Sequence, residues 1–133
     1  MRADTRTISI NAPPVKVAAY LSNVINLPRW AVGFAKAVRQ SEAGWLVETS
    51  NGEMSIRIES DARTGTVDFW MTPVPGRDML AASRVISRGE GSEYVFTQFQ
   101  GPGMPDDVFA KNVQALMHEL TVLKALMEVE CPL

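Results

Sequence analysis

A long amphipathic segment near the C-terminus constrains the fold most strongly. Pro105 and Pro132 bracket about 26 residues with no other helix breaker, and Asp106 and Asp107 complement the positive end of a helix dipole. Apolar residues recur at helical spacing, at Phe109, Val113, Leu116, Leu120, Leu123 and Met127. Another layer of structure must cover the apolar stripe of this helix of roughly 39 Å.

A run of short alternating segments between residues 36 and 100 supplies that layer. Turn signals interrupt it about every eight to twelve residues, at Gly44, Asn51–Gly52, 61–65, 73–76 and 89–91. The pattern predicts about six antiparallel strands, and residues 6–10 add one more, with Ile8 and Ile10 on one face. We expect a single α+β domain over residues 1–133, with one antiparallel sheet of about seven strands.

Two short helices are predicted between the first strand and the rest of the sheet. Pro13 suits the first turn of a helix that reaches about Leu21, and residues 23–30 form a second, irregular helical turn. The Leu27–Pro28 step should end this turn, because the residue before proline is disfavoured in the helical region.

The turn positions also predict a strand register. Centring the turn of residues 73–76 on Gly76 places Phe69 opposite Ser83 and Asp68 opposite Arg84. With the next turn centred on residue 90, the predicted apolar face comprises Met54, Ile56, Ile58, Val67, Phe69, Met71, Ala81, Ser83, Val85, Val95, Thr97 and Phe99. The opposite face then carries Trp70, Tyr94 and Phe96. Either Trp70 packs over Ala82 and is half covered by its own neighbours, which is the favoured interpretation, or these aromatics have a cover such as a second subunit in a homodimer. A slip of one residue would exchange the two faces.

Few residues are suited to catalysis. His118 falls opposite the apolar stripe, and Cys131 lies beside Glu130, which disfavours its thiolate. With His118 directed away from the stripe, no Ser-His-Asp or Cys-His arrangement can be assembled, and a single histidine cannot form a two-histidine metal site, so we assign no catalytic residue, metal or cofactor. The net charge of −2 argues against a nucleic-acid partner, and no run of eighteen apolar residues indicates integral membrane association. The expected location is the cytoplasm.

The order of elements and several motifs resemble the SRPBCC superfamily, which includes START domains, birch-pollen-allergen-like proteins and polyketide cyclase/dehydrase-like proteins. The resemblance is carried by Ile10-Asn11-Ala12-Pro13, Asn26-Leu27-Pro28-Arg29-Trp30, Gly65-Thr66-Val67-Asp68, Arg84-Val85-Ile86, Gly91-Ser92-Glu93 and Glu119-Leu120. It implies a helix-grip fold, in which the sheet wraps around the long helix and leaves an apolar cavity.

The lining of the implied cavity follows from the predicted register and the helix stripe. Its ligand-binding residues are predicted to be Trp30, Phe34, Met54, Ile56, Phe69, Met71, Ser83, Val85, Thr97, Phe99, Asn112, Val113, Leu116 and Leu120. Arg57, Asp68 and Arg84 form an ion-pair row on the surface in this register, or a polar hook for the ligand if the register is slipped.

Three functions are compatible with these residues. The first is binding of a hydrophobic small molecule, a lipid, a sterol or an aromatic metabolite, and the resemblance favours it. The second is a polyketide cyclase or dehydratase that works by positioning its substrate, which needs a polar side chain in the cavity. The third is a self-association or partner-interaction module that uses the outer aromatics. Binding is expected rather than enzymatic activity.

Overall fold

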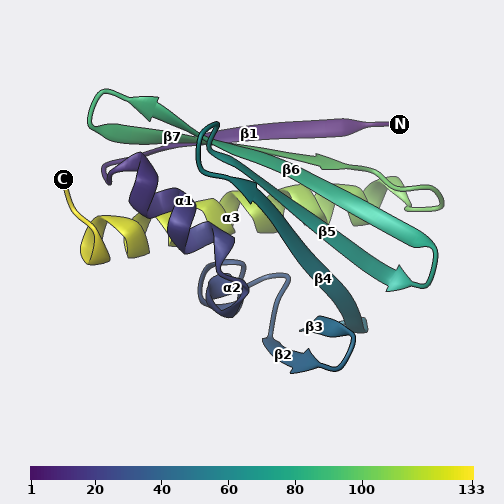
Figure 1. Cartoon of the computed structure of the whole chain (residues 1–133). Coiled ribbons are helices and arrows are strands. Elements are labelled where there is room, and N and C mark those ends of the chain that lie inside the picture. Colours follow the sequence, from purple (N-terminus) through teal and green to yellow (C-terminus); the bar gives the residue numbers. More distant parts are fainter.

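The computed structural model covers residues 1–133 and contains one seven-stranded antiparallel sheet and a long C-terminal helix (Figure 1). The strands are β1 (Ala3–Ile10), β2 (Ala37–Ser41), β3 (Gly44–Thr49), β4 (Gly52–Asp61), β5 (Thr66–Val74), β6 (Arg77–Arg88) and β7 (Gly91–Phe99). The helical elements are α1 (Pro14–Ser22), the 3-10 turn η1 (Val24–Asn26), α2 (Leu27–Trp30) and α3 (Asp106–Glu130). This confirms the predicted α+β helix-grip fold.

The sheet is a meander that the first strand completes. Its strand order is β1-β7-β6-β5-β4-β3-β2, so every neighbouring pair from β2 to β7 is consecutive in the chain. The N-terminal strand β1 instead pairs with β7, from Ala3 opposite Phe99 to Ile10 opposite Ser92. The α3 helix lies across the concave side of this sheet (Figure 1).

The space between the sheet and α3 is filled at one end. There α1 packs against β4 to β7, and the side chains of Val17, Leu21, Leu123 and Met127 are almost completely buried. The closest backbone neighbours of α3 are β1 and α2, whereas β4, β5 and β6 remain more distant from it. A solid core therefore forms beside α1 and the C-terminal half of α3, and the N-terminal half faces a wider gap.

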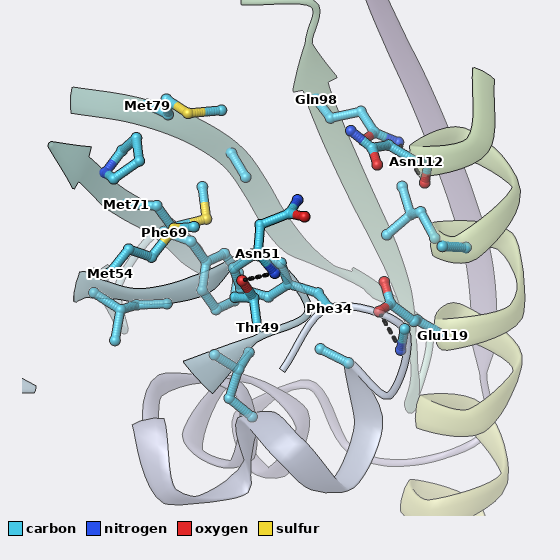
Figure 2. Close-up of a pocket in the computed structure, with 18 of the residues that line it drawn as sticks. Phe34, Thr49, Asn51, Met54, Phe69, Met71, Met79, Gln98, Asn112 and Glu119 are labelled. Atoms are coloured by element: carbon cyan, nitrogen blue, oxygen red, sulfur yellow. Dashed lines mark hydrogen bonds between the residues drawn. The ribbon is translucent and has the colours of Figure 1, made fainter. Parts of the chain in front are cut away.

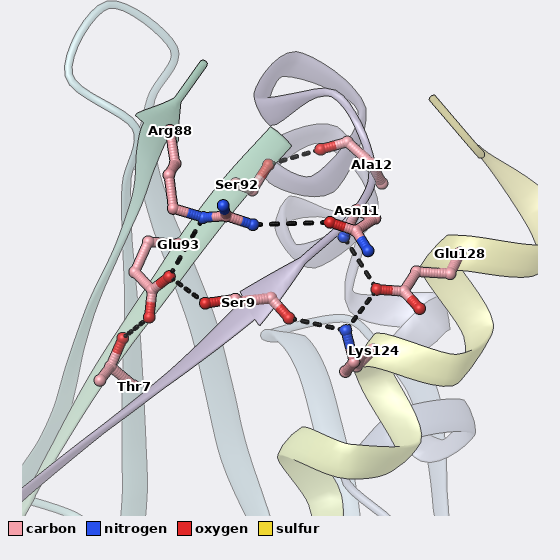
Figure 3. A network of polar contacts seen from close by, with 9 residues as sticks. All are labelled: Thr7, Ser9, Asn11, Ala12, Arg88, Ser92, Glu93, Lys124 and Glu128. Atoms are coloured by element: carbon pink, nitrogen blue, oxygen red, sulfur yellow. Dashed lines mark hydrogen bonds and ion pairs between the residues drawn. The ribbon is translucent and has the colours of Figure 1, made fainter. Parts of the chain in front are cut away.

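A polar network ties this solid end together (Figure 3). The Glu93 carboxylate on β7 accepts hydrogen bonds from the Thr7 and Ser9 hydroxyls of β1, each at 2.5 Å. On α3, the Glu128 carboxylate accepts from the Asn11 backbone N–H at 2.8 Å and from Lys124 at 2.5 Å. Lys124 also donates to the backbone carbonyl of Ser9 at 3.0 Å. These bonds fix the C-terminal half of α3 to β1.

The register between β6 and β7 differs from the prediction by one residue. Arg88 pairs with Gly91, which leaves a two-residue turn, and Gly89 adopts a positive φ of 61° there. Tyr94 therefore faces inward beside Val85 and is fully buried, as is most of Phe96. The predicted inward positions of Val95 and Thr97 were wrong, since both lie on the outer face, where Thr97 hydrogen-bonds the Thr5 hydroxyl at 2.8 Å.

The register between β5 and β6 differs by two residues, which keeps each side chain on its predicted face. An irregularity between Met71 and Val74 shifts the pairing, so Phe69 lies opposite Ala81 instead of Ser83. The predicted pairing of Asp68 with Arg84 was wrong for the same reason. Asp68 lies opposite Glu59, and the Arg84 guanidinium donates to the Thr64 carbonyl at 2.9 Å.

Proline 28 begins a helical turn where an ending was predicted. Leu27 is helical, with φ −57° and ψ −46°, and Pro28 occupies the first turn of α2, where its missing N–H costs no hydrogen bond. The steric preference of a residue before proline is overridden in this case. None of the helices combines the length and apolarity that crossing a bilayer requires.

Candidate functional site

A cavity of about 440 Å³ lies between the inner face of the sheet and the N-terminal half of α3. Hydrophobic residues provide 17 of its 26 lining positions, and this volume is typical of small-molecule sites. Its walls come from strands β4 to β7, from α2 and the loop after it, from the β3–β4 turn and from α3. The exposed residues Asn51 and Asn112 mark an opening between that turn and α3 (Figure 2).

The cavity floor is aromatic and rich in methionine. Trp30, Phe69 and Phe96 line it, with Phe69 centred 6.1 Å from each of the other two rings. Figure 2 shows Met54 and Met71 on neighbouring strands beside Phe69. Because thioether side chains are flexible and polarizable, this wall can adapt to ligands of irregular shape.

Nine of the fourteen predicted lining residues border the cavity, and five do not. Those that border it are Trp30, Phe34, Met54, Ile56, Phe69, Met71, Phe99, Asn112 and Leu116. Ser83, Val85, Val113 and Leu120 are buried away from the cavity, and Thr97 faces outward. The prediction placed the cavity along the whole sheet and the whole helix stripe, whereas α1 fills one end of that space.

Glu119 is the buried carboxylate of this cavity, and it was not among the predicted lining residues. Its residue is only 5% exposed, and the side chain projects from α3 towards the loop after α2 (Figure 2). The Gly33 backbone N–H donates to Oε2 at 2.9 Å. A Cβ added to Gly33 would lie 3.1 Å from the Cβ of Ala115, so glycine allows this close approach.

Burial raises the pKa of Glu119 from 4.5 to about 7. Removing the carboxylate from water penalises its charged form, and the backbone amides of Gly33 and Phe34 offset only part of this effect. Near neutral pH, Glu119 is therefore present in both forms: the protonated form can donate a hydrogen bond, and the ionised form can accept a proton.

The helical position of Glu119 could have revealed its role. At 100° per residue it lies about 80° from Phe109, on the same side of the helix as Asn112. Val108 and Ala115 lie on that side too and line the cavity. The cavity thus faces one flank of the stripe, and a carboxylate beside Val108 and Ala115 on this flank is the signal that was available.

The three candidate hook residues lie outside the cavity. Arg57 stacks over the Trp70 ring at 5.6 Å and forms an ion pair with Glu59 at 3.0 Å. Asp68 and Arg84 share this outer face. Trp70 is the only one of the three predicted outer aromatics that lies there, because Tyr94 and Phe96 point inward. Self-association through this face stays a prediction, and it is now supported by one outer aromatic residue instead of three.

The two other residues considered for chemistry lie apart from the cavity. His118 is exposed on α3, as predicted, and Cys131 follows the end of that helix. No cluster of three or more histidine, cysteine, aspartate or glutamate residues has an arrangement that could hold a metal ion.

The family described as "Polyketide cyclase / dehydrase and lipid transport" matches residues 1–128. The chain belongs to this family. The family description names both enzymes and lipid transport, and both agree with a hydrophobic cavity. Family membership alone therefore does not distinguish an enzyme from a carrier. No curated protein matches the sequence.

Solved structures share the fold of this polyketide cyclase/dehydrase family member at low sequence identity. The protein XoxI from Bacillus cereus has a TM-score of 0.75 and 15% identity, with 96% of each chain covered. The Zhui aromatase/cyclase from Streptomyces sp. R1128 has a TM-score of 0.71 and 17% identity, covering 96% of this chain and 93% of that one. The Aha1 dimer from Colwellia psychrerythraea has a TM-score of 0.72 and 17% identity, covering 97% and 98%.

Proposed function

We propose that the protein binds an apolar small molecule in the cavity between the sheet and α3. The observation that carries this proposal is the cavity itself, about 440 Å³ of space with a predominantly hydrophobic lining and an opening to solvent. A soluble chain that only needed a stable core would gain packing contacts by closing this space. Family membership supports the same conclusion.

Native mass spectrometry of freshly purified protein, followed by solvent extraction, tests this proposal. We expect an apolar compound to co-purify, or a neutral naphthalene probe to bind with a stoichiometry of one per chain. The Ala81→Leu variant provides the control, because Ala81 lines the cavity and a larger side chain occupies part of its volume. Absence of both the co-purifying compound and probe binding would refute the proposal.

A cyclase or dehydratase activity is the second candidate, and Glu119 is the observation that favours it. A dehydration needs one group that removes a proton and returns it. The ionised carboxylate would take the proton on the carbon next to a ketone and then donate it to the departing hydroxyl of a β-hydroxy ketone, which leaves as water and gives the enone. A group whose pKa is near the working pH is suited to both transfers.

Enone formation from a soluble aromatic β-hydroxy ketone, followed by its ultraviolet absorbance, tests this second candidate. We expect turnover by the unaltered protein, unchanged turnover by His118→Gln and loss of turnover by Glu119→Gln. Equal rates for the unaltered protein and Glu119→Gln would contradict the assignment. The Zhui aromatase/cyclase shares the fold, which supports testing this chemistry.

A further inference from the structure

We propose that the bound molecule has a polar end that donates a hydrogen bond to Glu119 and carries no negative charge. The ligand class is therefore an alcohol, a phenol or an amine on an apolar body, and fatty acids and other carboxylates are disfavoured when Glu119 is ionised. This inference rests on the proposed binding function and specifies which ligands the same cavity accepts.

One oxygen of Glu119 is available to a ligand. Oε2 accepts the hydrogen bond from the Gly33 N–H, and the neighbouring Phe34 N–H donates to the Ala31 carbonyl at 3.0 Å, which leaves Oε1 without a hydrogen bond from the chain. Only Tyr20, Trp30 and Trp70 have a side-chain polar atom that is both completely enclosed and unpartnered. The unpartnered Oε1 is therefore not completely enclosed, and Glu119 lines the cavity. In Figure 2 the Glu119 carboxylate lies at the α3 wall, and the oxygen that is not bonded to the loop after α2 points away from that loop. The geometry leaves one acceptor for a hydrogen-bond donor.

The charge of the cavity selects against anions. Two carboxylates, Glu53 and Glu119, are its only charged lining residues, and it contains no lysine, arginine or histidine. Glu53 is exposed and forms an ion pair with Arg39 at 2.7 Å, so its charge is balanced at the surface. Glu119 has no such partner. A ligand carboxylate placed beside the ionised Glu119 would be repelled in a poorly solvated space.

The neutral polar groups of the cavity do not reverse this selection. The Thr49 hydroxyl is already engaged, since it donates to the Gly52 carbonyl at 2.8 Å and accepts from the Asn51 N–H at 3.1 Å. Asn112 is exposed and Gln98 half-buried, so both amides lie where water competes for them. The Trp30 Nε1–H has no partner either, but it is completely enclosed by the chain, so a ligand does not reach it. Glu119 is therefore the strongest hydrogen-bonding group that an enclosed ligand can reach.

Four matched probes test the inference by isothermal titration calorimetry. Naphthylmethanol, naphthylmethylamine, naphthoate and methylnaphthalene share one ring system and differ in their polar ends. At about pH 8.5, where Glu119 is ionised, we expect the alcohol and the amine to bind at least about tenfold tighter than naphthoate. The alcohol should also bind tighter than methylnaphthalene. At about pH 5.5 the deficit of naphthoate should shrink, because Glu119 then carries a proton that it can share.

Two variants connect this selectivity to the Glu119 charge. Glu119→Gln should remove most of the difference between naphthylmethanol and naphthoate, whereas Glu90→Gln, at an exposed turn, should retain it. Naphthoate binding as tightly as naphthylmethanol at high pH would overturn the inference while leaving the proposed binding function intact. Selectivity that survives in Glu119→Gln would overturn it too. If none of the four probes bound, the proposed function and this inference would both fail.

Discussion

Replacing Glu119 with glutamine should stabilise the protein at high pH. The side chain keeps its shape, and its carbonyl oxygen can still accept the Gly33 N–H hydrogen bond. What the variant removes is the ionisation of a buried carboxyl group. The free energy of unfolding should therefore change by an amount that depends on pH, and a merely structural disturbance would not produce that dependence.

The magnitude follows from the pKa of Glu119, which rises from 4.5 to about 7 on folding. Between these two values the folded state retains the proton and the unfolded state loses it. The stability contributed by the protonated carboxyl is complete below about pH 4.5 and is lost as the pH rises through 7. At about 1.4 kcal/mol for each pKa unit, the loss amounts to about 3 kcal/mol.

Urea unfolding of both proteins at several pH values from about 5 to 8.5 measures this effect. We expect the advantage of Glu119→Gln over the unaltered protein to grow by about 2 to 3 kcal/mol across this range. Glu93 and Glu128, whose pKa values are lowered by hydrogen bonds, titrate identically in both proteins and cancel in the comparison. A difference that stays constant with pH would refute the reasoning.

Three other substitutions test particular contacts. Ala81→Leu should weaken naphthylmethanol binding at least about tenfold in a calorimetric titration, because the larger side chain occupies part of the cavity. The unfolding free energy should change by less than about 1 kcal/mol, since the new side chain enters empty space. Unimpaired binding would contradict this placement of the ligand. Gly65→Ala should lower the thermal midpoint far more than Gly89→Ala: both glycines have positive φ, but only at position 65 would a Cβ meet the Val85 carbonyl oxygen, at 2.1 Å. Similar losses would contradict the steric argument. Tyr94→Phe should cost about 1 kcal/mol in urea unfolding, because its buried hydroxyl donates to Ser83 at 2.9 Å; no loss would show that this bond contributes nothing.

Much of the fold was predictable because its signals are local. The stripe from Phe109 to Met127 and the regular turn spacing predicted α3 and the seven strands, and the structure contains both. The strand register was not predictable to the same extent. Whether the turn after β6 contains two or three residues decides if Tyr94 faces the core or the solvent, and glycine at 89 is compatible with either.

The candidate site was predicted in part, since it depends on where the core is solid. Met54, Met71 and Phe69 were assigned from alternation along their strands, and they line the cavity. Glu119 was missed because a carboxylate is assumed to face water unless its surroundings are known. Its helical position beside Val108 and Ala115 was the available signal, but the approach of the Gly33 loop to α3, which completes the buried environment, is a contact between distant residues that helical periodicity does not encode.

A crystal structure of the protein with naphthylmethanol tests the central claim most directly. We predict the ring between the aromatic floor and α3, beside Met54 and Met71, with the hydroxyl oxygen about 2.7 Å from Oε1 of Glu119. A ring bound elsewhere, a hydroxyl directed away from Glu119, or an interior closed by repacked side chains would contradict the claim that this fold encloses a cavity for a hydrogen-bond-donating apolar ligand.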